Sequence, residues 1–95
     1  MKAVTVKGVT STGFKYDIDP ANLDDFYLLE LFGKSQKGDV SALSALMERM
    51  LGEDQKAALL KHCEDEKGRA RMSRIGDEIA DIYNGLIQER KVKNS

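Results

Sequence analysis

The chain has 95 residues, of which 15 are Lys or Arg and 16 are Asp or Glu, so its formal net charge at pH 7 is −1. This balance argues against a large basic surface for nucleic acids, and a chain of this length forms one domain that buries only about 60–65% of its unfolded surface. Its single cysteine, Cys63, cannot form an internal disulfide, so nothing indicates an oxidising compartment.

Residues 1–7 lack the apolar stretch of a signal peptide, and no segment approaches the ~20 apolar residues of a transmembrane helix. We therefore expect a cytoplasmic protein that is neither exported nor inserted in a membrane. Many domains of this size gain stability by assembling, so a homo-oligomer stays open.

Residues 1–19 are predicted to form a β-hairpin. Apolar and polar residues alternate over 4–7 and over 14–18, which is the period of half-buried strands. The segment from Gly8 to Gly13 supplies the turn, and Val9 can extend the first strand. An isolated hairpin is marginally stable, so we expect helices to pack on it.

A helix is predicted to begin at Asp19-Pro20, because aspartate is a good N-cap and proline fits the first helical turn. One helical side contains Leu23, Phe26, Tyr27, Glu30 and Leu31, and the other sides contain Leu28, Leu29 and Phe32. A helix that is apolar nearly all round must be covered on more than one face. Two interpretations stay open: a central core helix, or a helix with one side that meets another protein.

Two shorter helices are predicted next. Asp39 caps the first, which ends at Gly52, and Glu53-Asp54 begins the second after a tight turn. Methionine fills irregular cores and also suits surfaces that accept varied partners, so both roles stay open for Met47 and Met50.

The last helix has the clearest 3.6-residue period. Its apolar side contains Met72, Ile75, Ile79, Ile82, Tyr83 and Leu86, and its polar side contains Arg74, Asp77, Glu78 and Asp81. Gly76 and Gly85 each cost about 1 kcal/mol relative to alanine if they are interior, or they permit close helix packing. The fold class is therefore mainly α, in a single domain of residues 1–95: a short N-terminal β-hairpin, about four helices in residues 20–88 and a polar, frayed tail in residues 89–95.

No motif for catalysis or cofactor binding is found: there is no phosphate-binding glycine loop, no Cys/His spacing suited to zinc and no nucleophile motif. His62 and Cys63 are neighbours, and adjacent helical side chains point about 100° apart, so they cannot easily converge on one metal. The acidic cluster of residues 64–66 lacks the alternating oxygen ligands of a calcium loop. We expect no enzyme activity, no catalytic residue, no cofactor and no metal site.

The densest basic run, residues 67–74, raises the alternative of a small DNA-binding regulator, with the helices on either side of Gly52 as a helix-turn-helix. The second of these helices opens with Glu53 and Asp54, whose negative charge would face the phosphates. The basic run more readily neutralises its acidic neighbours. Nucleic acid is therefore not the expected partner.

The order of these signals resembles one known family. The segments that carry the resemblance are Gly13-Phe14-Lys15-Tyr16-Asp17-Ile18-Asp19, Leu23-Asp24-Asp25, Leu28-Leu29-Glu30, Leu51-Gly52-Glu53-Asp54-Gln55, His62 and Asp65-Glu66-Lys67-Gly68-Arg69. Over roughly residues 13–87, their succession resembles the tail assembly chaperones of long-tailed bacteriophages and prophages. The segment 70–73 is more basic than the Val-Pro that the family often has there, so client specificity is expected to differ.

The resemblance implies a non-catalytic protein of the host-cell cytoplasm that is absent from the mature virion. Such proteins coat the long helical tape measure protein, keep it soluble and help to recruit tail tube subunits. The family has no catalytic residues to carry over. A structural head–tail component is the other alternative to this function. On the basis of surplus apolar character, the candidate partner-binding residues are Leu28, Leu29, Phe32, Met47, Met50, Ile82 and Leu86.

Overall fold

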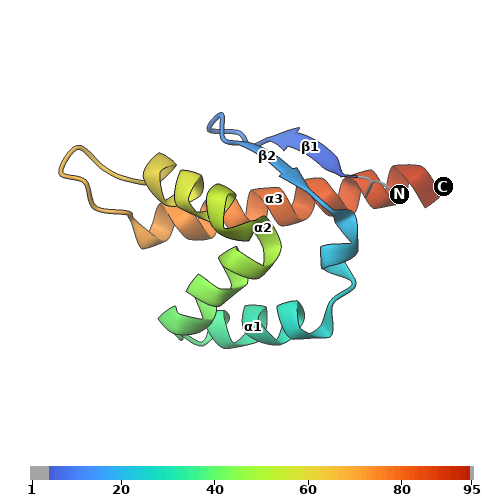
Figure 1. Ribbon diagram of the computed structural model, residues 1–95, viewed down its shortest axis with the longest axis horizontal. Coiled ribbons are helices and arrows are strands. Elements are labelled where there is room, and N and C mark those ends of the chain that lie inside the picture. Colours follow the sequence, from blue (N-terminus) through green and yellow to red (C-terminus); the bar gives the residue numbers. More distant parts are fainter. Residues whose placement is uncertain (1–4, 95) are drawn as a thin grey trace.

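The computed structural model describes the backbone of residues 5–94 and the side chains of residues 5–87, and it is mainly helical, with an N-terminal β-hairpin (Figure 1). The elements are, in order, β1 (Val6–Val9), β2 (Lys15–Ile18), the 3-10 helix η1 (Pro20–Leu23), α1 (Phe26–Gln36), α2 (Val40–His62) and α3 (Met72–Asn94). The predicted class of a mainly α domain with an N-terminal hairpin is confirmed. Val4, which was expected in the first strand, lies outside the described residues.

The hairpin pairs β1 and β2 antiparallel, in a register that runs from Val6 opposite Ile18 to Val9 opposite Lys15. Gly13 ends its turn with a φ of 96°, a conformation that glycine adopts without steric cost. The apolar side of the hairpin is buried as the alternation predicts, through Phe14, Tyr16 and Ile18.

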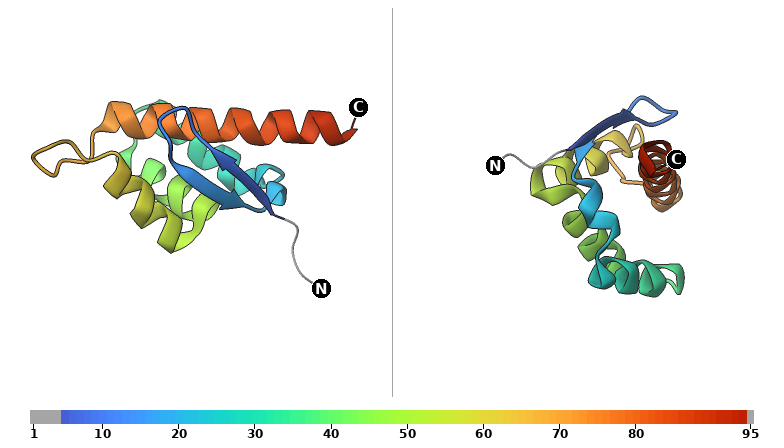
Figure 2. Two further views of the ribbon diagram at one scale, coloured as in Figure 1. Left: turned by 90° about the horizontal axis from the view of Figure 1, so that it is seen from above. Right: turned by 90° about the vertical axis from the view of Figure 1, so that its right-hand side faces the viewer.

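The hairpin and α1 lie on opposite sides of the molecule, with α2 between them (Figures 1 and 2). β2 contacts α2, β1 contacts α3, and α1 packs mainly on α2. These contacts enclose one apolar core, formed by Phe14, Tyr16, Ile18, Leu23, Leu28, Leu46, Met47, Met50, Leu51, Leu59, Cys63, Ile75, Ile79, Ile82 and Leu86. The helices thus provide the cover that a two-stranded hairpin needs.

Asp19 and Pro20 begin a helix as predicted, but it is the single turn η1 rather than the start of a longer α-helix. Asp19 is the N-cap, and its Oδ1 accepts a hydrogen bond from the Ala21 N–H at 2.9 Å. The chain is extended again at Asp25, with φ −130° and ψ 109°, and α1 begins at Phe26. Two caps therefore follow one another, and the second determines which side of α1 faces the core.

The two helices expected on either side of Gly52 form one element, α2, so residues 5–94 contain three α-helices where about four were predicted. Gly52 has non-helical backbone angles, with φ 82° and ψ 166°, and α2 is kinked at this residue. Glycine adopts such a positive φ without steric cost. The N-cap prediction is confirmed, since Asp39 Oδ1 accepts a hydrogen bond from the Ala42 N–H at 3.1 Å.

The side of α3 that is buried follows the predicted period, through Ile75, Ile79, Ile82 and Leu86. Two residues differ from the prediction: Met72 is 54% exposed, and Glu78, expected on the polar side, is only 3% exposed. The helical backbone continues to Asn94, through most of the segment expected to be a frayed tail. No helix in the described part of the chain is both long and apolar enough to cross a membrane.

Gly85 allows α3 to approach the hairpin closely. A Cβ atom at this position would lie 2.5 Å from the hydroxyl oxygen of Tyr16, whereas a Cβ atom at Gly76 would have no neighbour within 4 Å. Of the two roles that the sequence leaves open for these glycines, close packing applies to Gly85 alone.

Candidate functional site

Three large apolar side chains are exposed on α1. Phe26 is 71% exposed, Tyr27 63% and Leu29 46%. They lie at the start of α1, on the side of the molecule away from the hairpin (Figure 1). Single exposed apolar residues are common on protein surfaces, but a group within four positions of one helix forms a patch. We call these three residues the outer face of α1.

The start of α1 is held by Asp25. Its Oδ1 accepts a hydrogen bond from the Tyr27 N–H at 3.0 Å, and its Oδ2 accepts one from the Arg49 Nε–H. One carboxylate therefore caps α1 and joins it to α2. The hydrogen bond from Arg49 is the main reason why the pKa of Asp25 lies below its usual value.

The same arginine positions the aromatic part of the outer face. The Arg49 guanidinium lies 5.2 Å from the centroid of the Tyr27 ring, within the range of a cation–π interaction. The Tyr27 and Phe26 rings meet edge to face, with their centroids 6.2 Å apart. Both rings are thus held by neighbours while most of their surface stays open to solvent.

The opposite side of α1 anchors the helix. Leu28 is only 1% exposed, and Leu31 and Phe32 are half-buried. The Phe32 ring stacks on Tyr83 of α3, with an interplanar angle of 24° and a centroid distance of 5.8 Å. Turning the outer face of α1 inward would break these contacts, so its exposure is a property of the packed fold.

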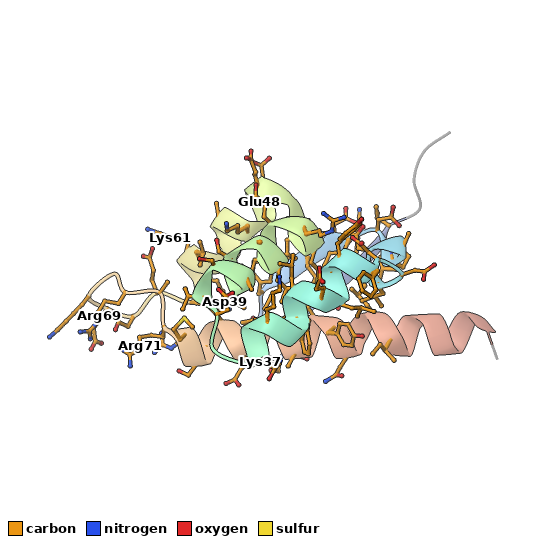
Figure 3. The ribbon with its side chains drawn as sticks, turned by 90° about the horizontal axis from the view of Figure 1, so that it is seen from below. Lys37, Asp39, Glu48, Lys61, Arg69 and Arg71 are labelled. Atoms are coloured by element: carbon orange, nitrogen blue, oxygen red, sulfur yellow. The ribbon has the colours of Figure 1, made fainter. Side chains whose placement is uncertain are left out.

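The charges beside the outer face change sign along α1. Asp24 and Glu30 are exposed near the first half of the helix, and Lys34 and Lys37 are exposed towards its end. Figure 3 shows Lys37 where α1 ends, next to the connection to α2. A helical partner with the reverse order of charges would therefore match this surface.

The structure corrects the predicted partner-binding residues in part. Those that belong to the core, at 3% exposure or less, are Leu28, Met47, Met50, Ile82 and Leu86. A side chain that packs inside the core cannot also be offered to a partner by the folded chain. The role left open for Met47 and Met50 is therefore core filling, whereas Leu29 is exposed and Phe32 is half-buried.

Phe26 and Tyr27 are the surface residues that sequence reasoning missed. The pattern placed them on one side with Leu23, as if a single helix ran on from Pro20. The chain leaves the helical conformation between η1 and α1, so the 3.6-residue spacing counted from Leu23 does not continue into α1. The signal was present in Asp25, an N-cap residue directly before the aromatic pair.

A buried polar cluster attaches the tip of the hairpin to α3. The Glu78 carboxylate, whose side chain is 4% exposed, accepts hydrogen bonds from the hydroxyls of Thr10 and Thr12, each at 2.8 Å. His62 Nε2 lies 2.9 Å from Thr12 Oγ1 and 3.7 Å from Glu78 Oε1. The carboxylate can be buried because these groups satisfy it.

A cavity of about 260 Å³ borders this cluster, lined by Thr12, His62, Cys63, Arg74, Asp77 and Glu78. Cys63 is 1% exposed, and burial raises the pKa of its thiol, which makes it a weak nucleophile at neutral pH. Among the described residues, no group of three or more His, Cys, Asp or Glu side chains could hold a metal ion.

The basic residues between α2 and α3 interact with their acidic neighbour. Asp65 accepts hydrogen bonds from the backbone N–H groups of Lys67 and Arg69, and the Arg69 Nε–H donates to the same carboxylate at 2.9 Å. Arg71 lies 3.9 Å from it. Figure 3 shows Arg69 and Arg71 on this loop, at one end of the molecule. The loop is therefore organised by its own charge pairs.

Comparison of the chain with protein-family models, with curated proteins and with solved structures finds no match. Function must therefore be argued from the surfaces that the chain presents. Among the described residues, the outer face of α1 is the largest group of adjacent exposed apolar side chains.

Proposed function

We propose that the protein is a non-catalytic assembly factor that binds helical, apolar segments of another protein through the outer face of α1. The observation that carries this proposal is the exposure of Phe26, Tyr27 and Leu29 on a helix whose opposite side is anchored in the core. Burying them against a partner would remove their apolar surface from water, which is the main favourable contribution to protein association.

The size of the outer face argues for weak binding by a single copy. Given the areas of such side chains, their exposed parts sum to roughly 350 Å². A stable interface buries about 800 Å² on each partner. One copy should therefore bind transiently, and lasting coverage of a client would need many copies along one chain.

The order of charges favours an antiparallel client helix. Helices commonly carry acidic residues near their N-terminus and basic residues near their C-terminus, because these charges complement the helix dipole. Laid antiparallel on α1, such a helix would place its basic end beside Asp24 and Glu30 and its acidic end beside Lys34 and Lys37. Opposite charges would then meet at both ends of the apolar contact.

The resemblance to tail assembly chaperones suggests which client this is. We propose the tape measure protein as the client, with tail tube subunits as the second partner that displaces the chaperone. The proposed place of action is the host-cell cytoplasm, and the protein would be absent from the finished virion. Weak binding by each copy suits this role, because a client that is bound too tightly cannot be handed over.

The experiment that tests the proposal is co-expression with the tape measure protein of the same genome. The wild-type protein should keep that chain soluble and co-purify with it, whereas the double variant Phe26→Ser/Leu29→Ser should lose both effects and keep its helical circular dichroism spectrum. Val40→Ser is the matched control, because Val40 is an exposed apolar residue too, at 61%, but lies at the start of α2. Equal activity of all three proteins would refute the proposal.

The two alternative functions make different predictions. A DNA-binding regulator would bind duplex DNA in a strongly salt-sensitive way. The pairing of Arg69 and Arg71 with Asp65 reduces the positive charge that such binding needs. A structural head–tail component would be present in purified phage particles, whereas the proposed chaperone would be absent from them.

A further inference from the structure

The backbone groups of the hairpin alternate between its interior and its edges. In an antiparallel pair, hydrogen-bonded and non-hydrogen-bonded residue pairs follow one another in turn. The Thr10 N–H donates to the Phe14 C=O at 2.9 Å, which fixes this alternation for the pairs further along. The N–H and C=O groups of Lys7 and Val9 therefore point away from β2, towards the outer edge of β1.

At Asp17, the corresponding edge of β2 is covered by a side chain of α2. Gln55 Oε1 accepts a hydrogen bond from the Asp17 N–H at 2.7 Å, and Gln55 Nε2 donates to the Asp17 C=O at 2.8 Å. Gln55 Nε2 also lies 2.9 Å from the Leu51 C=O, which helps to hold the amide in place. Gln55 thus makes the two hydrogen bonds that a further strand would make at Asp17.

Among the described residues, no side chain covers the outer edge of β1 as Gln55 covers β2 at Asp17. In the described part of the chain, no protein group pairs with the outward N–H and C=O groups of Lys7 and Val9. The Lys7 side chain is exposed, and Val9 is 61% exposed. A short edge that carries a lysine resists unspecific pairing with apolar strands, but it stays open to a segment that neutralises the lysine.

We propose that the outer edge of β1 binds an extended segment of a partner protein, which adds to the hairpin as a third strand. The backbone groups of Lys7 and Val9 would supply the hydrogen bonds, as in other cases of strand addition. This site goes beyond the proposed function and does not depend on the outer face of α1, because the two surfaces lie on opposite sides of the molecule (Figures 1 and 2).

The exposed side chains define the chemistry of this segment. Lys15 lies opposite Val9 on the neighbouring strand, and Lys7 precedes Val9 by two residues on the same strand. The exposed face of the hairpin therefore has a lysine on each of two sides of Val9. Opposite charges across a strand pair stabilise it and like charges destabilise it. The segment should therefore carry an acidic residue opposite Lys7 and a β-branched residue opposite Val9. A second copy paired about Lys7 would instead place lysine opposite lysine.

A direct test uses a capped eight-residue peptide as the probe, in which every second residue is threonine and the residues between are alternately valine and glutamate, so that one face presents both valine and glutamate. The peptide is added to the full chain, and amide hydrogen exchange is measured by NMR. The amides of Lys7 and Val9 should gain protection with saturation, and the amide of Lys15 on the other edge should not. A peptide with lysine in place of glutamate should bind roughly fivefold more weakly, the scale of a cross-strand charge pair.

Three variants make the test specific. Val9→Pro removes an outward N–H without removing a hydrogen bond of the hairpin, so it should abolish binding, whereas Lys15→Pro makes the same change on β2 and should leave it intact. Lys7→Glu should reverse the preference between the two peptides, and it leaves the backbone unchanged if a proline variant fails to fold. The proposal is overturned if neither peptide protects these amides, if both bind alike, or if Lys7→Glu has no effect.

Self-association provides one more decisive outcome. If the amides of Lys7 and Val9 are already protected in the absence of peptide, and sedimentation shows a dimer that Lys7→Glu alters, the edge is occupied by a second copy. That result would overturn the assignment to a separate acidic segment.

Discussion

Gly85 and Gly76 lie in the same helix, and replacing each by alanine should change stability in opposite directions. Alanine is favoured over glycine inside a helix by about 1 kcal/mol, and this gain applies at both positions. At Gly76 no atom outside the adjacent residues and the backbone of the same helix lies within 4 Å of the added methyl group, so Gly76→Ala should stabilise the protein by up to about 1 kcal/mol.

At Gly85 the added methyl group would lie 2.5 Å from the hydroxyl oxygen of Tyr16, a distance at which something must shift. Overpacking a core costs typically 1–3 kcal/mol, so the net effect of Gly85→Ala should be a destabilisation of roughly 0–2 kcal/mol. In a domain of this size, 1 kcal/mol shifts Tm by about 4–8 °C, so thermal unfolding can separate the two variants.

Tyr16→Phe identifies the atom responsible. The nearest ring carbon of Tyr16 would be 3.8 Å from the new methyl group at Gly85, an ordinary contact, so removing the hydroxyl should relieve Gly85→Ala. At Gly8 an added methyl group would also lie 2.4 Å from a ring carbon, so Tyr16→Phe should not relieve Gly8→Ala. A double-mutant cycle corrects for the cost of Tyr16→Phe alone. Additive effects at Gly85, or equal rises in Tm for both alanine variants of α3, would refute the reasoning.

Three further predictions concern other parts of the fold. The pKa values of Asp25 and Asp65 lie below the ordinary 3.8, because Asp25 accepts a hydrogen bond from the Arg49 side chain and Asp65 accepts one from the Arg69 backbone. The stability that these carboxylates provide is therefore present above that pH and is lost as the pH falls through their lowered pKa values. Asp25→Asn should reduce the fall in Tm on acidification. Gln55→Ala removes both hydrogen bonds to Asp17, so urea unfolding should show a loss of about 1–2 kcal/mol and the Asp17 amide should exchange faster. Cys63 should react with a thiol reagent only after unfolding, and rapid labelling of the native protein would contradict its burial.

Local patterns predicted most of the fold. The alternation in 14–18 identified the buried side of β2, and the 3.6-residue period identified the side of α3 that packs in the core. The N-cap at Asp39 was also readable from the sequence, because a cap is a contact between neighbouring residues. These features depend on residues that are close together in the chain.

The parts that were missed depend on contacts between distant residues. Glu78 has the spacing of a surface residue, and its partners Thr10 and Thr12 are more than sixty positions away in the chain. The split between η1 and α1 depends on the conformation of Asp25, which is held by Arg49 of α2 as well as by its own capping hydrogen bond. The candidate site was therefore only partly readable, because the pattern shows which residues are apolar but not which of them the core leaves outside.

The most direct test of the central claim is site-specific photo-crosslinking in cells that co-express the tape measure protein. A photoreactive amino acid is placed at Leu29 in one variant and at Val40 in the other. If the outer face of α1 is the binding surface, the variant at Leu29 should crosslink to the tape measure protein and the variant at Val40 should not. Crosslinks from Val40 with none from Leu29 would contradict the account.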